Sequence, residues 1–185
     1  AVGKGLIKIV NNQLKYFTVD DGLISNYIRD IVRVSPDELW IATWNGISIL
    51  KNGKFSEFKL LEKQTYVLNI LPDSNTIWIA TGGKGLYKYE NDSISSYTTS
   101  NGLASNSFTE LTKGIDNDIW LGSGMGLTNL GNGSTLIIND KNGLDFQDID
   151  CLFTDREGIL WVGTNGGGLY KFAGKLITTF NVKSG

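Results

Sequence analysis

The sequence contains no histidine, a single cysteine and only two prolines among its 185 residues. Without an imidazole, the chain has no histidine general base, no histidine-containing catalytic triad and no histidine-based metal site. The single Cys151 excludes an internal disulfide, and its place in the apolar segment IDCLF predicts a small buried side chain. We expect no cofactor and no metal site.

A glycosidase needs only two carboxylates, so the absence of histidine does not exclude that class of enzyme. Most of the available carboxylates lie in predicted turns, where an aspartate ordinarily accepts hydrogen bonds from its own backbone. We therefore expect no catalytic activity in this segment. The carboxylates concerned are Asp20, Asp21, Asp30, Glu110, Asp145, Asp148 and Asp150.

Long apolar runs and a strong charge imbalance are also absent. The formal net charge is −2, and no apolar run approaches the roughly 18 residues that a membrane-spanning helix requires. The three arginines are far apart in the sequence, so no basic stripe is available for nucleic acid. We expect no nucleic-acid partner and no transmembrane helix within these residues.

What the sequence does contain is a block that recurs four times, each time around a tryptophan. Trp40, Trp78, Trp120 and Trp161 are spaced by 38, 42 and 41 residues, which is the period of a four-stranded propeller blade. Short apolar runs separated by Asn and Gly follow each block and indicate hairpins, as in GISILK-NGK-FSEF. No stretch sustains a helical period. The fold class predicted is all-β, a β-propeller segment.

We predict one domain over residues 1–185 with about four four-stranded blades and a half blade. Residues 5–19 match only the last two strands of a repeat, and nothing after residue 180 supplies their partners. An open arc would expose the apolar faces of its first and last blades, so we expect self-association through those faces. The whole blades are predicted at 22–59, 65–98, 102–139 and 143–180.

The repeat resembles the two-component regulator propeller repeat. The resemblance rests on Gly-Leu, an Asn, a strand, and then Leu-Trp-Ile-Gly-Thr followed by Gly-Leu, and it is fullest in residues 22–47 and 155–172. It implies a fragment of a seven-bladed propeller in the periplasmic sensor part of a hybrid two-component system of Bacteroides-type bacteria. It also implies a histidine kinase in the parent protein, oligosaccharide ligands derived from glycans, and control of polysaccharide-utilisation genes.

A binding site is predicted on the rim that carries the turns between the second and third strands and between blades. Trp44 is notable because the other three tryptophan blocks carry Gly or Asn at the equivalent place. An exposed tryptophan can stack on a sugar ring while amide and carboxyl groups bind its hydroxyls. The candidate ligand-binding residues are Tyr27, Trp44, Asn45, Phe108, Phe146, Gln147, Asp148 and Asn165.

Two other interpretations remain open at this stage. Trp44 could pack against a neighbouring blade or a partner chain, in which case the propeller is a protein–protein interaction scaffold with no small-molecule ligand. The segment could also be inactive by itself, with its site shared with missing blades or another domain of the parent protein. A fluorescence response to an oligosaccharide, lost on replacing Trp44, separates ligand binding from the scaffold.

Overall fold

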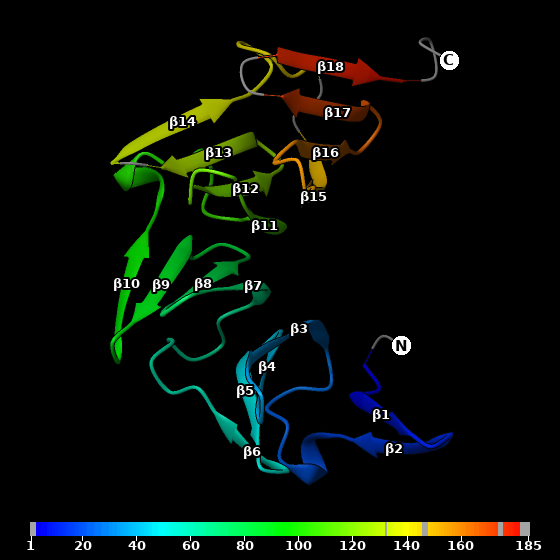
Figure 1. The fold of residues 1–185 in the computed structure, drawn as a ribbon. Helices are drawn as coiled ribbons and strands as arrows, with labels where there is room; N and C mark the ends of the chain where they lie inside the picture. Colours follow the sequence, from blue (N-terminus) through cyan, green and yellow to red (C-terminus); the bar gives the residue numbers. More distant parts are fainter. Residues whose placement is uncertain (1–2, 132, 146–147, 174–175, 182–185) are drawn as a thin grey trace.

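The computed structural model describes residues 3–131, 133–145, 148–173 and 176–181, and these form an open arc of β-sheets (Figure 1). One two-stranded and four four-stranded antiparallel sheets are present in the described part of the chain. Apart from two short 3-10 turns, its regular elements are all strands. The prediction of an all-β propeller fragment is confirmed.

The half blade at the N-terminus consists of β1 (Leu6–Val10) and β2 (Gln13–Phe17). Blade I contains β3 (Ile28–Ser35), β4 (Glu38–Thr43), β5 (Gly46–Lys51) and β6 (Lys54–Glu57). Blade II contains β7 (Val67–Asp73), β8 (Thr76–Thr81), β9 (Leu86–Glu90) and β10 (Ser93–Tyr97). Blade III contains β11 (Glu110–Lys113), β12 (Ile119–Ser123), β13 (Gly126–Gly131) and β14 (Ser134–Ile138). Blade IV contains β15 (Ile149–Thr154), β16 (Leu160–Thr164), β17 (Gly168–Ala173) and β18 (Leu176–Phe180).

Within each whole blade, the four strands pair in sequence order. The first strand of each blade, β3, β7, β11 or β15, lies on the concave side of the arc, and the fourth lies on its outside (Figure 1). The sheets of blades I, II and III therefore present one face to the preceding blade and the other to the following blade. This arrangement explains why both faces of the second strand carry apolar or small residues.

The Gly-Leu-x-x-Asn pattern folds the connection between blades. Thr18 caps the 3-10 turn Val19–Asp21 in a capping box with Asp21, and Gly22 ends it at a φ of 102°. The side chain of Asn26 then accepts a hydrogen bond of 2.9 Å from the Val19 N–H. The same arrangement recurs from Thr98 to Asn106. The pattern thus sets the direction in which the chain enters blades I and III.

The small residue two places after each tryptophan allows neighbouring sheets to approach closely. Ala42 and Ala80 are fully buried. A Cβ on Gly122 would lie 2.7 Å from Cγ2 of Ile149 in the next blade. In blade IV, a Cβ on Gly163 would instead lie 2.5 Å from Sγ of its cross-strand partner Cys151 within the same sheet. Because real Cβ atoms essentially never approach so closely, a larger residue at Gly122 would force blades III and IV apart.

Polar contacts between the innermost strands connect successive blades. The Asp30 carboxylate of blade I accepts a hydrogen bond from the Ile70 N–H of blade II at 2.9 Å. In turn, the Asn69 amide donates to Glu110 of blade III at 2.8 Å. Thr109 of blade III donates to the Ile149 carbonyl at 2.8 Å. Each blade is therefore hydrogen-bonded to the next one along the concave side.

The two ends of the arc expose apolar side chains. Ile9 and Leu14 face each other across the half blade, and they are 68% and 56% exposed. In blade IV, Phe153 is 63% exposed on the side where a following blade would pack. Cys151 is exposed on that same strand, so the prediction that it is buried was wrong. The apolar segment was identified correctly, but it borders an open face.

Candidate ligand-binding surfaces

Three aromatic side chains gather on the rim beside the turn between β4 and β5. The ring of Trp44 stacks on Tyr27, with centroids 4.4 Å apart and planes inclined by 13°. Tyr66 of blade II approaches the same indole edge-on at 5.6 Å. Tyr27 and Trp44 remain 42% and 49% exposed. Tyr27, Trp44 and Tyr66 together form the rim cluster.

A backbone hydrogen bond that recurs around the arc positions the rim cluster. The Trp44 N–H donates to the Tyr27 carbonyl at 3.1 Å, and the Gly82 N–H donates to the Tyr66 carbonyl at 2.9 Å. Thr43 stabilises the tight turn by donating to the Gly46 carbonyl. Tyr27 and Tyr66 are thus equivalent residues of adjacent blades, which brings both rings to Trp44.

Tyr66 was missed by the sequence analysis. The second repeat lacks the Gly-Leu pair, so its residues before β7 could not be aligned by that pattern. A signal was nevertheless present, since Tyr66 directly precedes the buried Val67 as Tyr27 precedes Ile28. Polar groups lie in the two equivalent turns. Asn45 is exposed in the same turn as Trp44, and Lys84, in the corresponding turn of blade II, pairs with Glu62 at 2.7 Å.

Asp148 and Asn165 occupy the same pair of positions in blade IV that Tyr27 and Trp44 occupy in blade I. The Asn165 N–H donates to the Asp148 carbonyl at 2.9 Å, and its side-chain amide donates to the carboxylate at 3.2 Å. Both residues are exposed. Blades II and III lie between them and Trp44 in the arc (Figure 1). The predicted residues therefore form two separate groups.

Phe108 does not contribute to the rim surface, in contrast to its predicted role as a ligand contact. Its side chain is 0% exposed and packs in the core with Ala80, Leu86 and Leu111. The physical reason is its register, because Phe108 lies five residues after Leu103, as the fully buried Ile149 lies five residues after Leu144. The remaining two candidates, Phe146 and Gln147, lie outside the described residues.

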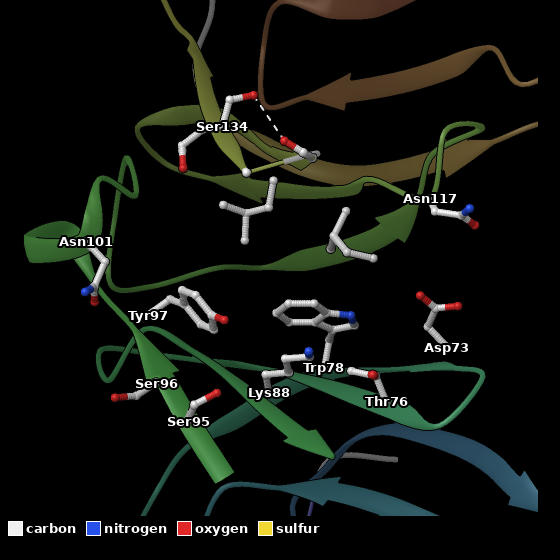
Figure 2. Close-up of a pocket in the computed structure, with 15 residues that line it drawn as sticks. Asp73, Thr76, Trp78, Lys88, Ser95, Ser96, Tyr97, Asn101, Asn117 and Ser134 are labelled. Atoms are coloured by element: carbon white, nitrogen blue, oxygen red, sulfur yellow. Dashed lines mark hydrogen bonds between the residues drawn. The ribbon is translucent and has the colours of Figure 1, made fainter. Parts of the chain in front are cut away.

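A groove of about 650 Å³ lies between blades II and III, away from the rim cluster. Figure 2 shows Trp78 and Tyr97 side by side along one wall, with Asp73 and Asn117 toward one end and Asn101 toward the other. The centroids of the two rings are 5.9 Å apart. The sequence analysis did not predict this groove.

The charged groups along the groove are paired with opposite charges. Lys88 lies 5.8 Å from the centroid of the Trp78 ring and forms an ion pair of 2.9 Å with Glu90. The hydrogen bond from Lys88, followed by that from Thr76, lowers the pKa of the Glu90 carboxyl. Asp73 pairs with Lys113 at 2.5 Å. The lining thus combines aromatic, hydroxyl and amide groups with neutralised charges.

With this geometry established, the molecule is a β-propeller fragment by its class of fold. Residues 22–45 and 143–166 match the family described as two component regulator propeller, which confirms the resemblance. The matched segments contain the first two strands of blades I and IV and the connections before them. A comparison with curated protein sequences finds no match.

Solved structures agree with the fold. The extracellular domain of one protein assigned to the hybrid two-component systems of B. thetaiotaomicron is similar with a TM-score of 0.78 and 22% identity, over 91% of this chain and 26% of that chain. A second such extracellular domain from the same bacterium has a TM-score of 0.76 and 25% identity, over 88% of this chain and 24% of that chain. Virginiamycin B lyase from Staphylococcus aureus has a TM-score of 0.73 and 16% identity, over 98% of this chain and 65% of that chain.

The chain spans about a quarter of the length of the two extracellular domains. Together with the family match, the similarity to those domains supports a sensory module that lies outside the cytoplasm. Within the described residues, no helix is long and apolar enough to cross a membrane.

Proposed function

We propose that this chain is part of the periplasmic ligand-recognition region of a hybrid two-component sensor histidine kinase, and that its ligands are oligosaccharides derived from glycans. Binding would regulate polysaccharide-utilisation genes through the kinase of the parent protein. The family match and the extracellular relatives support the sensory role and the setting. The ligand class rests on the side chains of the rim.

The observation that carries the ligand class is the exposed rim cluster. Trp44 and Tyr27 keep nearly half of their surface open to solvent although they stack on one another. Aromatic rings so placed offer an apolar surface to the C–H face of a pyranose. The neighbouring Asn45 amide and the Lys84–Glu62 pair supply groups that bind hydroxyls. This mixture suits a sugar better than a purely apolar ligand.

Titration of the 185-residue chain with gluco-, manno- and galacto-oligosaccharides, followed by tryptophan fluorescence, tests the proposal. We expect a saturable change for at least one sugar, lost in Trp44→Ala and weakened in Tyr27→Ala. Met125→Ala is the matched control, because Met125 is exposed in the equivalent turn of blade III. If no sugar of the series changes the fluorescence, the proposal fails and the scaffold interpretation gains support.

A further inference from the structure

We infer that the groove between blades II and III is a second binding site, which takes the ring of a neutral saccharide unit. The inference concerns a different surface from the rim cluster, because none of Tyr27, Trp44 and Tyr66 lines the groove. At the equivalent places between blades I and II and between blades III and IV, aromatic side chains meet.

Tryptophans of the arc face an aromatic residue of the following blade. Trp40 of blade I lies 5.7 Å from Tyr89 of blade II. Similarly, Trp120 of blade III lies 6.3 Å from Phe172 of blade IV. These rings fill the space between the outer parts of two sheets. Phe58 adds a third ring at 4.6 Å from Trp40, and the Trp40 side chain is only 3% exposed.

The register of the strands shows what blade III has in place of that ring. In blade II, Ile77, Tyr89 and Ile94 form one cross-strand row on the face toward blade I. The corresponding row of blade III is Ile119, Leu130 and Thr135.

Every other whole blade carries an aromatic residue in this row. Blade IV has Leu160, Phe172 and Ile177, and blade I has Leu39, Leu50 and Phe55. Blade III has none, and its next residue is Gly131, where a Cβ would lie 2.9 Å from Cβ of Asp118. Leu130, Gly131 and Thr135 all line the groove. The groove therefore occupies the place of a missing aromatic side chain.

The lining indicates what kind of ring would fill this space. Trp78 and Tyr97 offer two partly exposed aromatic faces, which suit the C–H face of a pyranose (Figure 2). Ser95, Ser134 and Thr135 contribute hydroxyl groups, and Asn101 and Asn117 contribute amides. Ser134 already donates to the Gly131 carbonyl, and the Asn101 oxygen already accepts from the Thr98 N–H. Sugar hydroxyls can bind the remaining hydrogen-bonding capacity of this lining, whereas an aromatic hydrocarbon ring cannot.

The charge of the site favours a neutral sugar. The two charged side chains in the lining, Asp73 and Lys88, already have partners in Lys113 and Glu90. An acidic sugar would have to compete with Glu90 for Lys88, and it would be repelled by Asp73. A uronic or sulfated unit is therefore disfavoured here.

The test places a larger side chain of the protein itself in the groove. Leu130→Phe restores the aromatic residue that blades II and IV carry, so the variant should fold and melt at a higher temperature than the original chain. Saturation-transfer NMR would measure the binding of neutral gluco-, manno- and galacto-oligosaccharides, with oligogalacturonate as the acidic probe. We expect binding of a neutral sugar that Trp44→Ala leaves in place and that the double variant Trp44→Ala with Leu130→Phe loses.

Each alternative outcome is decisive. In the Trp44→Ala background, three results would overturn the inference: binding that Leu130→Phe leaves unchanged, binding of oligogalacturonate in preference to neutral sugars, or no binding by any probe. If Leu130→Phe does not fold, Thr135→Ile replaces it, because it restores the isoleucine of blades II and IV. Binding lost in Trp44→Ala alone supports the rim site and contradicts the groove, so the two proposals fail separately.

Discussion

Trp44 and Tyr27 are stacked nearly parallel, with ring centroids 4.4 Å apart, although 17 residues separate them in the chain. The contact joins the turn after β4 to the residue before β3, so it closes the open end of the β3–β4 hairpin, next to the pair Ile28 and Thr43. A stack of this kind contributes about 0.5–1.5 kcal/mol beyond area burial. It is thus a structural contact as well as a candidate surface for a ligand.

The first prediction measures this coupling. In a double-mutant cycle of Tyr27→Ala and Trp44→Ala, the interaction free energy from urea unfolding should be about 0.5–1.5 kcal/mol. The matched cycle uses Tyr27→Ala with Met125→Ala, whose positions lie on different blades and should add independently. Strict additivity of the first pair would show that the stack contributes nothing to stability.

The second prediction concerns the close approach of blades III and IV. Gly122→Val should lower the free energy of unfolding by about 1–3 kcal/mol, because its side chain meets Ile149. Gly124→Ala is the control, since a Cβ there meets only an ordinary contact with Asp148 at 3.5 Å. It should change stability by less than about 0.5 kcal/mol. Equal effects of the two variants would contradict the packing argument.

The third prediction is a pH dependence at Glu110. Burial, followed by the nearby Asp30 carboxylate, raises the pKa of the Glu110 carboxyl. The stability linked to a raised folded-state pKa is fully present below the ordinary pKa of a glutamate, and it is lost as pH rises through the folded value. Ionised Glu110 therefore destabilises the fold at neutral pH.

Glu110→Gln keeps an oxygen that can accept the hydrogen bond from Asn69 and removes the charge. We expect its stability to equal that of the original chain near about pH 4 and to exceed it near about pH 7. Urea unfolding across this range measures the difference, with the exposed Glu57→Gln as the control for loss of one charge. A constant difference between the Glu110 variant and the original chain at all pH values would refute the assignment.

The fourth prediction is self-association through the ends of the arc. Ile9 and Leu14 at one end, and Phe153 and Leu169 at the other, are apolar and exposed. Light scattering after size-exclusion chromatography should show a dimer or larger species. Ile9→Lys with Phe153→Lys should shift it toward the monomer, whereas Val19→Lys, at an exposed site between blades, should not. A monomeric original chain would contradict this expectation.

The period and the turns predicted the architecture because a propeller repeats one local unit. The tryptophan spacing predicted the blades, and the alternation around Trp40 and Ala42 predicted sheets buried on both faces. Burial at particular sites was harder, since it depends on what packs against each face. Cys151 belongs to a strand that is apolar in character, yet no described element covers its side chain.

The errors at the site also have physical causes. Phe108 does lie in the connection before β11, as expected, but its side chain turns into the core instead of toward the rim. Tyr66 was missed because its repeat lacks the Gly-Leu pair. The groove depends on two blades at once, so Leu130 becomes informative only when its cross-strand row is known.

The absence of an aromatic ring at Leu130 also bears on the mechanics of the arc. Each blade packs mainly on its sequence neighbours, so the angle between two adjacent blades depends on the side chains that fill the space between them. Between blades II and III, the groove leaves part of that space open. A ligand bound in that groove would change the angle between blades II and III. Occupancy of one site would then change the curvature of the whole arc.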